Sequence, residues 1–353
     1  MLILASAATP MMTWIVWPTI KFVIAFHVVL GVVSVFTLVE RRVLAFMQAR
    51  RGPNRVGPHG LLQFVADPLK LMLKEDIVPS GAQKVPYFLA PMLPLIPAMT
   101  VFAIIPVGPP PAFEISSINI GVLLVLALTS TGVYGLILGG WASNNKYSLM
   151  GGLRSAAQMV SYEVPFALSV IGVLMLAGSL NLTEIVRYQE AHVWFVIPQI
   201  VAFFIFLVAM VAENNRAPFD IPEAESELVA GYHTEYSGMK FALFFLAEYA
   251  AMLVNSSLVV ILFFGGWTLA MGGWGLTTDV LAGWGIAGAI LGGAVFFAKV
   301  MAFMLLYVWL RGTFPRYRFD QLMDLGWKWM IPLALANIAV TGVVVLLIQA
   351  KGF

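Results

Sequence analysis

The sequence contains no cysteine, and this absence excludes several kinds of chemistry. A chain without thiols forms no disulfide, holds no thiolate zinc site, ligates no iron–sulfur cluster through cysteine and has no cysteine nucleophile. Charged residues are also scarce, at 11% of the chain against roughly 25% in soluble domains. Hydrophobic residues make up 60%, and the mean hydropathy is +0.90. Lipid rather than water is therefore the expected solvent.

Nucleotide and metal motifs are missing as well. Residues 283–288 match the glycine pattern of dinucleotide-binding turns, but they enter an apolar helix, follow no strand and precede no acidic residue at the required distance. There is no Walker A sequence, and the four His residues lack metal-ligand spacing. We therefore expect no FMN, NAD, haem, metal ion or iron–sulfur cluster to be bound by this chain. Most Lys and Arg residues lie beside apolar stretches, which argues against nucleic-acid binding.

Apolar stretches recur along the 353-residue chain, and each is long enough to cross about 30 Å of hydrocarbon. The pattern predicts a single all-α polytopic membrane domain over residues 1–353. Hydropathy places about eight transmembrane helices at residues 16–39, 87–107, 119–142, 160–178, 194–212, 241–264, 286–310 and 330–348. Four prolines between residues 86 and 97 predict a bend in the second span. Gly135 with Gly139, and Gly288 with Gly292, predict close helix packing.

The distribution of positive charge predicts the orientation. Eight Lys and Arg residues lie in the connection 41–84, two in 143–159, two in 213–240 and four in 311–328, which places sixteen on one side. The opposite side has two, Arg187 and Lys351. The positive-inside rule makes the side with sixteen charges cytoplasmic, so both termini are expected outside.

The first cytoplasmic loop, residues 41–84, combines cations with an apolar periodicity. Gly and Pro within residues 50–58 impose a specific loop conformation. Between Leu61 and Leu73, apolar residues recur at near-helical spacing with charged residues among them. This pattern predicts an amphipathic helix lying in the membrane interface after the first span. The cations alone would also suit a simpler role in fixing topology and contacting lipid headgroups.

A second loop, residues 213–240, is acidic where topology favours cations. Its six carboxylates, accompanied by two cations, are Glu213, Asp220, Glu223, Glu225, Glu227 and Glu235. A solvated acidic loop is the simplest interpretation. The Pro, Phe, Ile and Leu residues between the acids favour a partly buried segment instead, in which neighbouring carboxylates raise one another's pKa and titrate together. Such a cluster could take up and release protons near neutral pH.

Three ionisable residues lie within predicted spans, where a charge costs about 2.5–3.5 kcal/mol on insertion scales and usually faces protein or water. Glu163 lies near the cytoplasmic end of the fourth span, Glu248 about two turns into the sixth, and Lys299 midway along the seventh. Together with Glu213, they are candidates for a polar file that leads into the membrane.

Several of these motifs resemble one known family. The matching segments are residues 40–42 (ERR), 48–58 (QARRGPNRVGP), 161–164 (SYEV), 212–228 (AENNRAPFDIPEAESEL) and 316–322 (RYRFDQL). They are similar to the H subunit of bacterial proton-translocating NADH:quinone oxidoreductase, respiratory complex I. The likeness runs from the first span to the segment before the last.

The resemblance implies a translocase subunit without a complete catalytic site of its own, which forms much of a chamber for a quinone, with ubiquinone expected. It implies that quinone is bound by Arg41, Phe46, Asp67 and Phe245. The acidic loop residues would then connect the chamber, through Glu163, Glu248 and Lys299, to a polar axis that couples reduction to proton translocation. Expected partners are the peripheral-arm iron–sulfur and quinone-site subunits, other membrane-arm subunits and lipid. The expected location is the bacterial inner membrane, with both termini periplasmic.

Two other functions are compatible with parts of the pattern. A related membrane subunit of a hydrogenase or ferredoxin-linked complex would share the fold without quinone chemistry, but the nearly complete match of the first-loop motif favours the quinone enzyme. A stand-alone ion-coupled transporter would also have buried Glu and Lys residues. The absence of an evident internal repeat and the large loops argue against a transporter.

Overall fold

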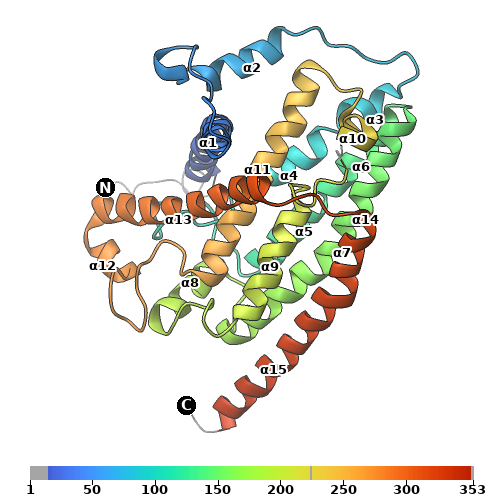
Figure 1. The fold of residues 1–353 in the computed structure, drawn as a ribbon. Coiled ribbons are helices and arrows are strands. Elements are labelled where there is room, and N and C mark those ends of the chain that lie inside the picture. Colours follow the sequence, from blue (N-terminus) through green and yellow to red (C-terminus); the bar gives the residue numbers. More distant parts are fainter. Residues whose placement is uncertain (1–14, 223–224, 351–353) are drawn as a thin grey trace.

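The computed structural model describes residues 15–222 and 225–350, which fold into a bundle of helices (Figure 1). In lipid, a helix satisfies its own backbone hydrogen bonds, which explains why the long apolar stretches adopt this structure. The helices are α1 (Trp17–Met47), α2 (Gln63–Leu73), α3 (Lys84–Leu89), α4 (Met92–Val101), α5 (Gly121–Ser130), α6 (Gly132–Ala142), α7 (Lys146–Ala177), α8 (Leu182–Ala191), α9 (Ile200–Glu213), α10 (Glu225–Leu228), α11 (Gly238–Phe263), α12 (Thr278–Gly283), α13 (Gly285–Thr313), α14 (Phe319–Asp324) and α15 (Ile331–Ala350).

Seven helical segments of the described chain are long and apolar enough to cross a membrane, and α9 is a shorter apolar helix. The seven are α1, α3 with α4, α5 with α6, α7, α11, α13, and α14 through α15. Together with α9 they coincide with the eight predicted spans, so the prediction of an all-α polytopic membrane protein is confirmed. The ends differ in places. Helix α7 begins at Lys146 rather than near residue 160, because the side chain of Asn145 caps it by accepting a hydrogen bond from the Tyr147 N–H (2.9 Å).

The proline-rich second span is interrupted at Ala90 and Pro91, between α3 and α4, within the stretch where the prolines predict a bend. The glycine pairs pack as predicted as well. A Cβ on Gly135 would overlap Pro94 and the Ala90 carbonyl, so α6 lies directly against the bend between α3 and α4. A Cβ on Gly288 would overlap the Leu281 carbonyl, which places α13 equally close to α12.

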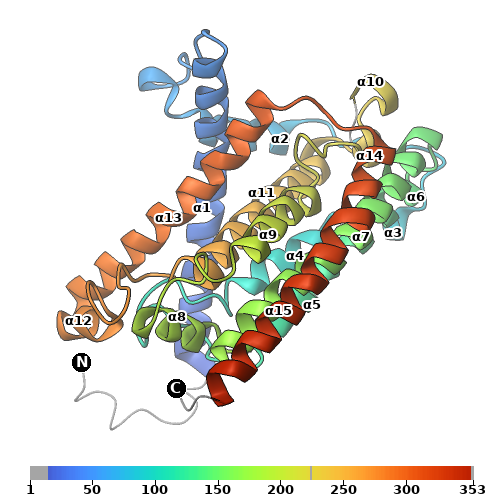
Figure 2. The same ribbon diagram turned by 60° about the horizontal axis from the view of Figure 1, so that its bottom comes forward.

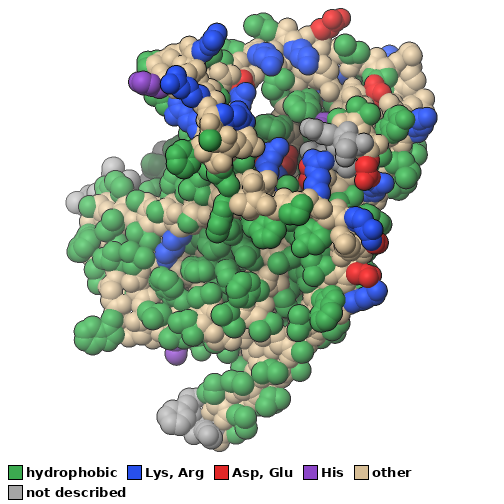
Figure 3. Space-filling view, in the orientation of Figure 1, with side chains coloured by type: hydrophobic (Ala, Val, Ile, Leu, Met, Phe, Trp, Pro, Cys, Tyr) green, Lys and Arg blue, Asp and Glu red, His purple; other side chains and the backbone are tan. Residues whose placement is uncertain are grey.

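The bundle has one charged end. Figure 2 shows α2, α10 and α14 on one side of the molecule, together with the last turns of α1 and α13; the start of α1 and the end of α15 lie on the opposite side. Lys, Arg, Asp and Glu side chains gather over α2 and beside α10 and α14, whereas the lower part of the visible face is mostly hydrophobic (Figure 3). We call these two sides the charged end and the far end.

Helix α11 is the central helix. Of its most apolar 18-residue window, 78% is buried within the protein, against 11% for the last span. It packs against α1, α2, α4, α9 and α13, whereas α15 packs along α7 and α9. Helix α2 is the amphipathic helix predicted after the first span, and its apolar residues Val65, Leu69 and Met72 are exposed. Its opposite side faces α1 and α11, and these three helices enclose the first part of the site.

Candidate functional site: an apolar chamber linked to a polar cavity

A cavity of about 620 Å³, which we call the chamber, lies between α1, α2 and α11 near the charged end. Its wall is mostly apolar and includes Leu30, Val33, Leu44, Phe64, Leu71, Met72, Met239, Leu243, Phe245 and Leu246. Seven polar or charged residues complete it: Ser34, Thr37, Glu40, Arg41, Asp67, Tyr249 and Arg311. An apolar pocket of this size with a few convergent polar groups is typical of a site for a small, largely hydrophobic molecule.

An ion pair fixes one wall of the chamber. Arg41 Nη1 at the end of α1 lies 2.6 Å from Asp67 Oδ2 on α2, and Gln63 donates a 2.6 Å hydrogen bond to the other carboxylate oxygen. Three of the four residues predicted to bind quinone, Arg41, Asp67 and Phe245, therefore line one cavity. Phe46 does not line it; this side chain is 86% exposed near the end of α1.

A buried ionic cluster closes the inner side of the chamber. Arg216 Nη1 lies 3.1 Å from Glu40 Oε1, and Arg216 Nε lies 2.5 Å from Glu248 Oε1. Arg311 approaches Glu40 Oε1 to 2.6 Å, while the Tyr249 hydroxyl donates to Glu40 Oε2. The Arg216 guanidinium also stacks over the Tyr249 ring at 4.5 Å. We call these five residues the Arg216 cluster.

The Arg216 cluster brings two carboxylates and two guanidinium groups together, so its formal charges balance. Glu40 and Arg216 are only 3% and 6% exposed. Burial by itself would lower the pKa of Arg216, but Glu248 and the other acidic neighbours raise it well above its ordinary value, and the guanidinium stays charged. Removing one member of such a buried group leaves its partners unpaired in a low dielectric, which is costly.

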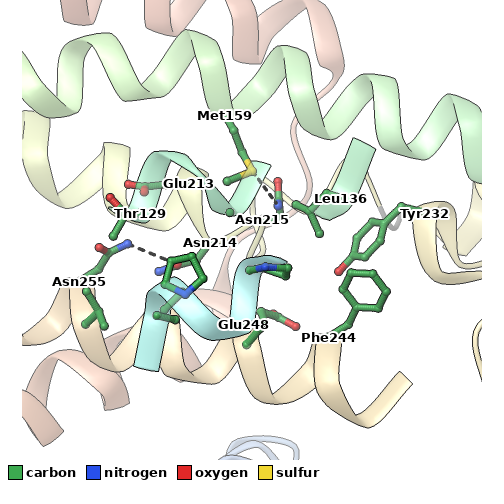
Figure 4. A pocket seen from close by; sticks show the side chains of 17 residues that line it. Thr129, Leu136, Met159, Glu213, Asn214, Asn215, Tyr232, Phe244, Glu248 and Asn255 are labelled. Atoms are coloured by element: carbon green, nitrogen blue, oxygen red, sulfur yellow. Dashed lines mark hydrogen bonds between the residues drawn. The ribbon is translucent and has the colours of Figure 1, made fainter. Parts of the chain in front are cut away.

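A second cavity, about 70 Å³, lies deeper among α4, α6, α7, α9 and α11, and we call it the inner cavity. Figure 4 shows Thr129, Glu213 and Asn255 on one side of it, Tyr232 and Phe244 on the other, and Glu248 between them. Glu213 and Asn214 reach it because α9 ends there, with Asn214 as its C-cap residue. Asn255 donates a 3.3 Å hydrogen bond to Asn214 Oδ1.

Several buried oxygen atoms around the inner cavity have no hydrogen-bond partner within the described residues: Glu213 Oε2, Asn215 Oδ1 and Asn255 Oδ1. Buried polar atoms without partners are rare in native proteins and usually indicate ordered water. One water needs a cavity of roughly 10–15 Å³ on this measure, so 70 Å³ accommodates several water molecules. The inner cavity is therefore suited to hold water that bridges these groups.

A third cavity of about 180 Å³ lies between the two regions. It shares Phe245 and Arg311 with the chamber. It also shares Asn215, Tyr232, Phe244 and Glu248 with the inner cavity. Three neighbouring cavities with shared wall residues thus lie in a series from the chamber, past the Arg216 cluster, to the carboxylate of Glu213.

The other predicted proton-coupling residues occupy different surroundings. Glu163 accepts a hydrogen bond from the Ser130 hydroxyl, on the α5 side of α7. Glu227 is exposed and lies 2.6 Å from Arg154 Nη1, while Glu235 accepts a 2.6 Å hydrogen bond from Asn145. Glu223 and the side chain of Glu225 lie outside the described residues.

Lys299 lies apart from these carboxylates. Its ammonium group donates to the carbonyl oxygens of Phe264 (2.7 Å), Gly266 (3.1 Å) and Thr268 (2.6 Å), beyond the end of α11. It also stacks over the Trp194 ring at 4.7 Å. The structure therefore does not bring Lys299 to the inner cavity.

The loop between α9 and α11 contains two groups with altered acidity. Burial raises the pKa of Asp220, and the neighbouring Arg316, whose Nη2 lies 2.8 Å from the carboxylate, partly opposes this shift. Burial lowers the pKa of His233 to about 4, so this imidazole is neutral near pH 7. Both residues line the cavity between the chamber and the inner cavity.

Four members of the Arg216 cluster were not predicted to act: Glu40, Arg216, Tyr249 and Arg311. Glu40, Arg216 and Tyr249 meet although Glu40 is 176 positions from Arg216 and 209 from Tyr249 along the chain. The sequence does not indicate these contacts, because Glu40 is followed by Arg41 and Arg42 and Arg216 lies in the acidic loop, so each has charged neighbours close to it along the chain.

These features define a polytopic helical membrane protein with an apolar chamber joined to buried carboxylates. A model of the NADH dehydrogenase family matches residues 20–342. An H subunit of NADH-quinone oxidoreductase from Geobacter metallireducens is 48% identical over 335 residues, covering 93% of this chain and 96% of that protein. The H subunit from Bacillus cytotoxicus is 50% identical over 324 residues, covering 91% and 92%. The chain belongs to the NADH dehydrogenase family, with the H subunits of NADH-quinone oxidoreductase as its relatives, which confirms the resemblance seen in its motifs.

Proposed function

We propose that this chain forms the membrane part of a quinone-binding chamber and couples quinone reduction to proton translocation. The chamber between α1, α2 and α11 receives the quinone, and its tail contacts the apolar wall. Arg41 and Asp67 lie at the polar rim, where a headgroup or the isoprenoid chain passes. The relatives are subunits of a quinone oxidoreductase, which supports this substrate class.

One contact carries the coupling proposal: the Arg216 guanidinium touches Glu40 of the chamber and Glu248 of the inner cavity. Reduction of a quinone to a quinol takes up two electrons and two protons, so negative charge builds up in the chamber until the protons arrive from neighbouring groups. A change of charge beside Glu40 alters how strongly Arg216 is held on that side, and so alters its attraction for Glu248. In a low-dielectric interior such shifts act over several ångströms, because little water screens them. Glu213, across the inner cavity, then gains or loses a proton.

The proposed function also implies the orientation of the chain in the membrane and the subunits that it contacts. The charged end faces the cytoplasm, where it meets the peripheral-arm subunits that supply electrons, and both termini face the periplasm of a bacterial inner membrane. The excess of cations at this end supports that orientation. Other membrane-arm subunits continue the polar axis beyond this chain. Ubiquinone is the expected quinone.

Two adjacent residues of α1 offer a matched test of the chamber. Ser34 lines it, whereas Val35 is 42% exposed and does not line it. In the assembled complex, Ser34→Phe should raise the KM for quinone and lower NADH:quinone activity, because the added ring occupies the chamber. Val35→Phe should change neither quantity. Electron transfer from NADH to a soluble acceptor should be normal in both variants, and unchanged quinone kinetics in Ser34→Phe would remove the chamber from the proposal.

The coupling contact has its own test. Glu248→Gln keeps the size of the side chain but removes the charge that Arg216 contacts, and we expect proton pumping to fall more than quinone binding. Glu227→Gln is the control, since this carboxylate lines none of the three cavities, is exposed and pairs with Arg154. Equal pumping in both variants, measured as acidification of membrane vesicles during NADH oxidation, would contradict the coupling route.

A further inference from the structure

The part of the bundle between the inner cavity and the far end differs in composition from the part near the charged end. From Leu258 to Phe263, every residue of α11 is at most 1% exposed, and all are apolar. Asn255, the last polar residue that lines the inner cavity on this helix, is eight residues before Phe263. At 1.5 Å per residue, the six residues of this apolar stretch span roughly 9 Å.

Aromatic rings from four helices fill this stretch. We call them the phenylalanine layer: Phe166 of α7, Phe203 and Phe206 of α9, Phe263 and Phe264 at the end of α11, and Phe303 of α13. Their ring centroids are 4.4 Å apart for Phe166 and Phe206, 5.6 Å for Phe206 and Phe263, and 5.3 Å for Phe264 and Phe303. Rings in these contacts exclude water, and a chain of water molecules is what a proton needs to cross.

Lys299 lies directly behind this layer. Its ammonium group has three N–H bonds, and each has a carbonyl oxygen within 3.1 Å, from Phe264, Gly266 and Thr268. These carbonyls follow the C-terminal end of α11, where the helix dipole favours a positive charge. A cation held in this way repels protons, as fixed positive groups do in pores that exclude them.

Four helix segments surround this region: α7 from Val164 onward, α9 before Glu213, α11 after Tyr249 and α13 up to Phe303. In the described residues of these segments, Lys299 is the ionisable side chain, apart from the weakly acidic hydroxyl groups of serine. Ser169 and Ser257 donate to carbonyls of their own helices and so are not available to a proton relay. Ser256 Oγ is buried without a hydrogen-bond partner. Within the described residues, these parts of α7, α9, α11 and α13 therefore contain no series of titratable groups.

We infer that the packed interior between α7, α9, α11 and α13 beyond the inner cavity is a proton seal, made of the phenylalanine layer and the fixed ammonium of Lys299. Charge that reaches the inner cavity does not cross the membrane between these four helices. The inference rests on the proposed function for the origin of that charge. It gives Lys299 a static role in place of the proton-carrying role predicted from its mid-span position.

The seal can be tested without quinone chemistry. Purified whole complex is reconstituted into liposomes with a pH gradient and a pH-sensitive dye inside, without NADH, and passive proton entry is measured. Phe206→Ser removes a fully buried ring and adds a hydroxyl, and we expect proton leak to increase several-fold. The matched control is Phe204→Ser on the same helix, whose ring is 56% exposed and lies outside the layer; its leak should equal that of the unmodified complex. If the Phe206→Ser complex assembles and its proton leak equals that of the unmodified complex, the inference of a proton seal is wrong.

Three further variants keep the inference testable if Phe206→Ser does not assemble. Ser256→Ala should leave the ratio of protons pumped to electrons transferred unchanged, and a reduced ratio would show that protons pass between these four helices. Lys299→Met should increase the proton leak, whereas Lys299→Arg keeps the positive charge and should have a smaller leak than Lys299→Met. If Lys299→Met instead abolishes pumping with no leak and with normal quinone reduction, Lys299 carries protons and the inference is wrong. Because the leak assay uses no NADH, failure of the quinone proposal would leave its result unaffected.

Discussion

The same helices α7, α9 and α11 form two regions with opposite chemistry. Toward the charged end they border the inner cavity, whose buried oxygen atoms have no protein partners among the described residues, and α11 also lines the other two cavities and contributes Glu248 and Tyr249 to the Arg216 cluster. Toward the far end they enclose closely packed aromatic and aliphatic side chains. A membrane helix gains nothing in stability from buried charges, which are expensive there. The acidic side chains of α7, α9 and α11, which are Glu163, Glu213 and Glu248, lie outside the phenylalanine layer, and this supports the proposed function of the part near the charged end.

The largest expected effect comes from breaking the Arg216 cluster. Arg216→Met leaves Glu40 and Glu248 buried without their shared partner, which costs about 3–5 kcal/mol. We expect little assembled complex and a lower temperature of unfolding. Arg154→Met is the control, because Arg154 pairs with the exposed Glu227, and such surface pairs contribute about 1 kcal/mol or less. Similar yields of assembled complex for Arg216→Met and Arg154→Met would show that the Arg216 cluster is not required for stability.

A smaller effect is expected at the loop that carries Asp220. This loop is attached to the segment before α14 by the Arg316–Asp220 ion pair, by a 3.1 Å hydrogen bond from the Tyr317 N–H to the Pro218 carbonyl, and by stacking of Phe219 on Tyr317. Arg316→Gln removes only the first of these. Arg316 is 42% exposed, so the change should cost no more than about 1 kcal/mol.

The expected result of Arg316→Gln is faster amide hydrogen exchange around Asp220, measured by mass spectrometry. The difference in exchange between the variant and the unmodified protein should decrease as the pH falls, because protonation of Asp220 removes its attraction to Arg316 in the unmodified protein as well. Since the pKa of Asp220 is raised, this protonation occurs at a higher pH than for an ordinary aspartate. Arg318→Gln, in an exposed pair with Asp320, should not change exchange in this loop. Equal exchange in the two variants would show that the ion pair does not order the loop.

The smallest effect is expected at His233, beside the third cavity. Burial lowers its pKa to about 4, whereas an ordinary histidine titrates near 6.5. Its charge therefore does not change between about pH 6 and 8, and His233→Gln should leave the shape of the pH–rate profile for quinone reduction unchanged in this range. Loss of an inflection near pH 6.5 in the variant would show that this imidazole titrates during turnover.

Much of the fold was predictable because lipid imposes a simple rule. Long apolar stretches must be helical, so hydropathy located the spans, and the prolines located the break between α3 and α4. The predicted ends of the helices were less accurate where a helix continues into polar sequence, as in the first turns of α7. The close contacts at Gly135 and Gly288 were also predictable, since small residues at regular spacing permit them.

The site was predictable only in part, because its ionic contacts join residues far apart in the chain. Arg41 and Asp67 were assigned to one site by family resemblance, and they do form a pair. The partner of Glu40 could not be read from spacing, since Arg216 meets it only when α1 and the loop after α9 pack together. Lys299 was placed with the carboxylates because of its depth in a span, but the backbone carbonyls beyond α11 satisfy it instead.

The most direct test of the central claim is the proton-to-electron ratio of the Glu213→Gln complex. Glu213 is at the inner end of the series of cavities, and glutamine fills the same space without taking part in proton exchange. With assembly intact, we predict that fewer protons are pumped per electron in membrane vesicles, whereas the exposed Glu227→Gln control behaves like the unmodified complex. Unchanged quinone reduction and pumping in Glu213→Gln would contradict the proposed route from the chamber to the inner cavity.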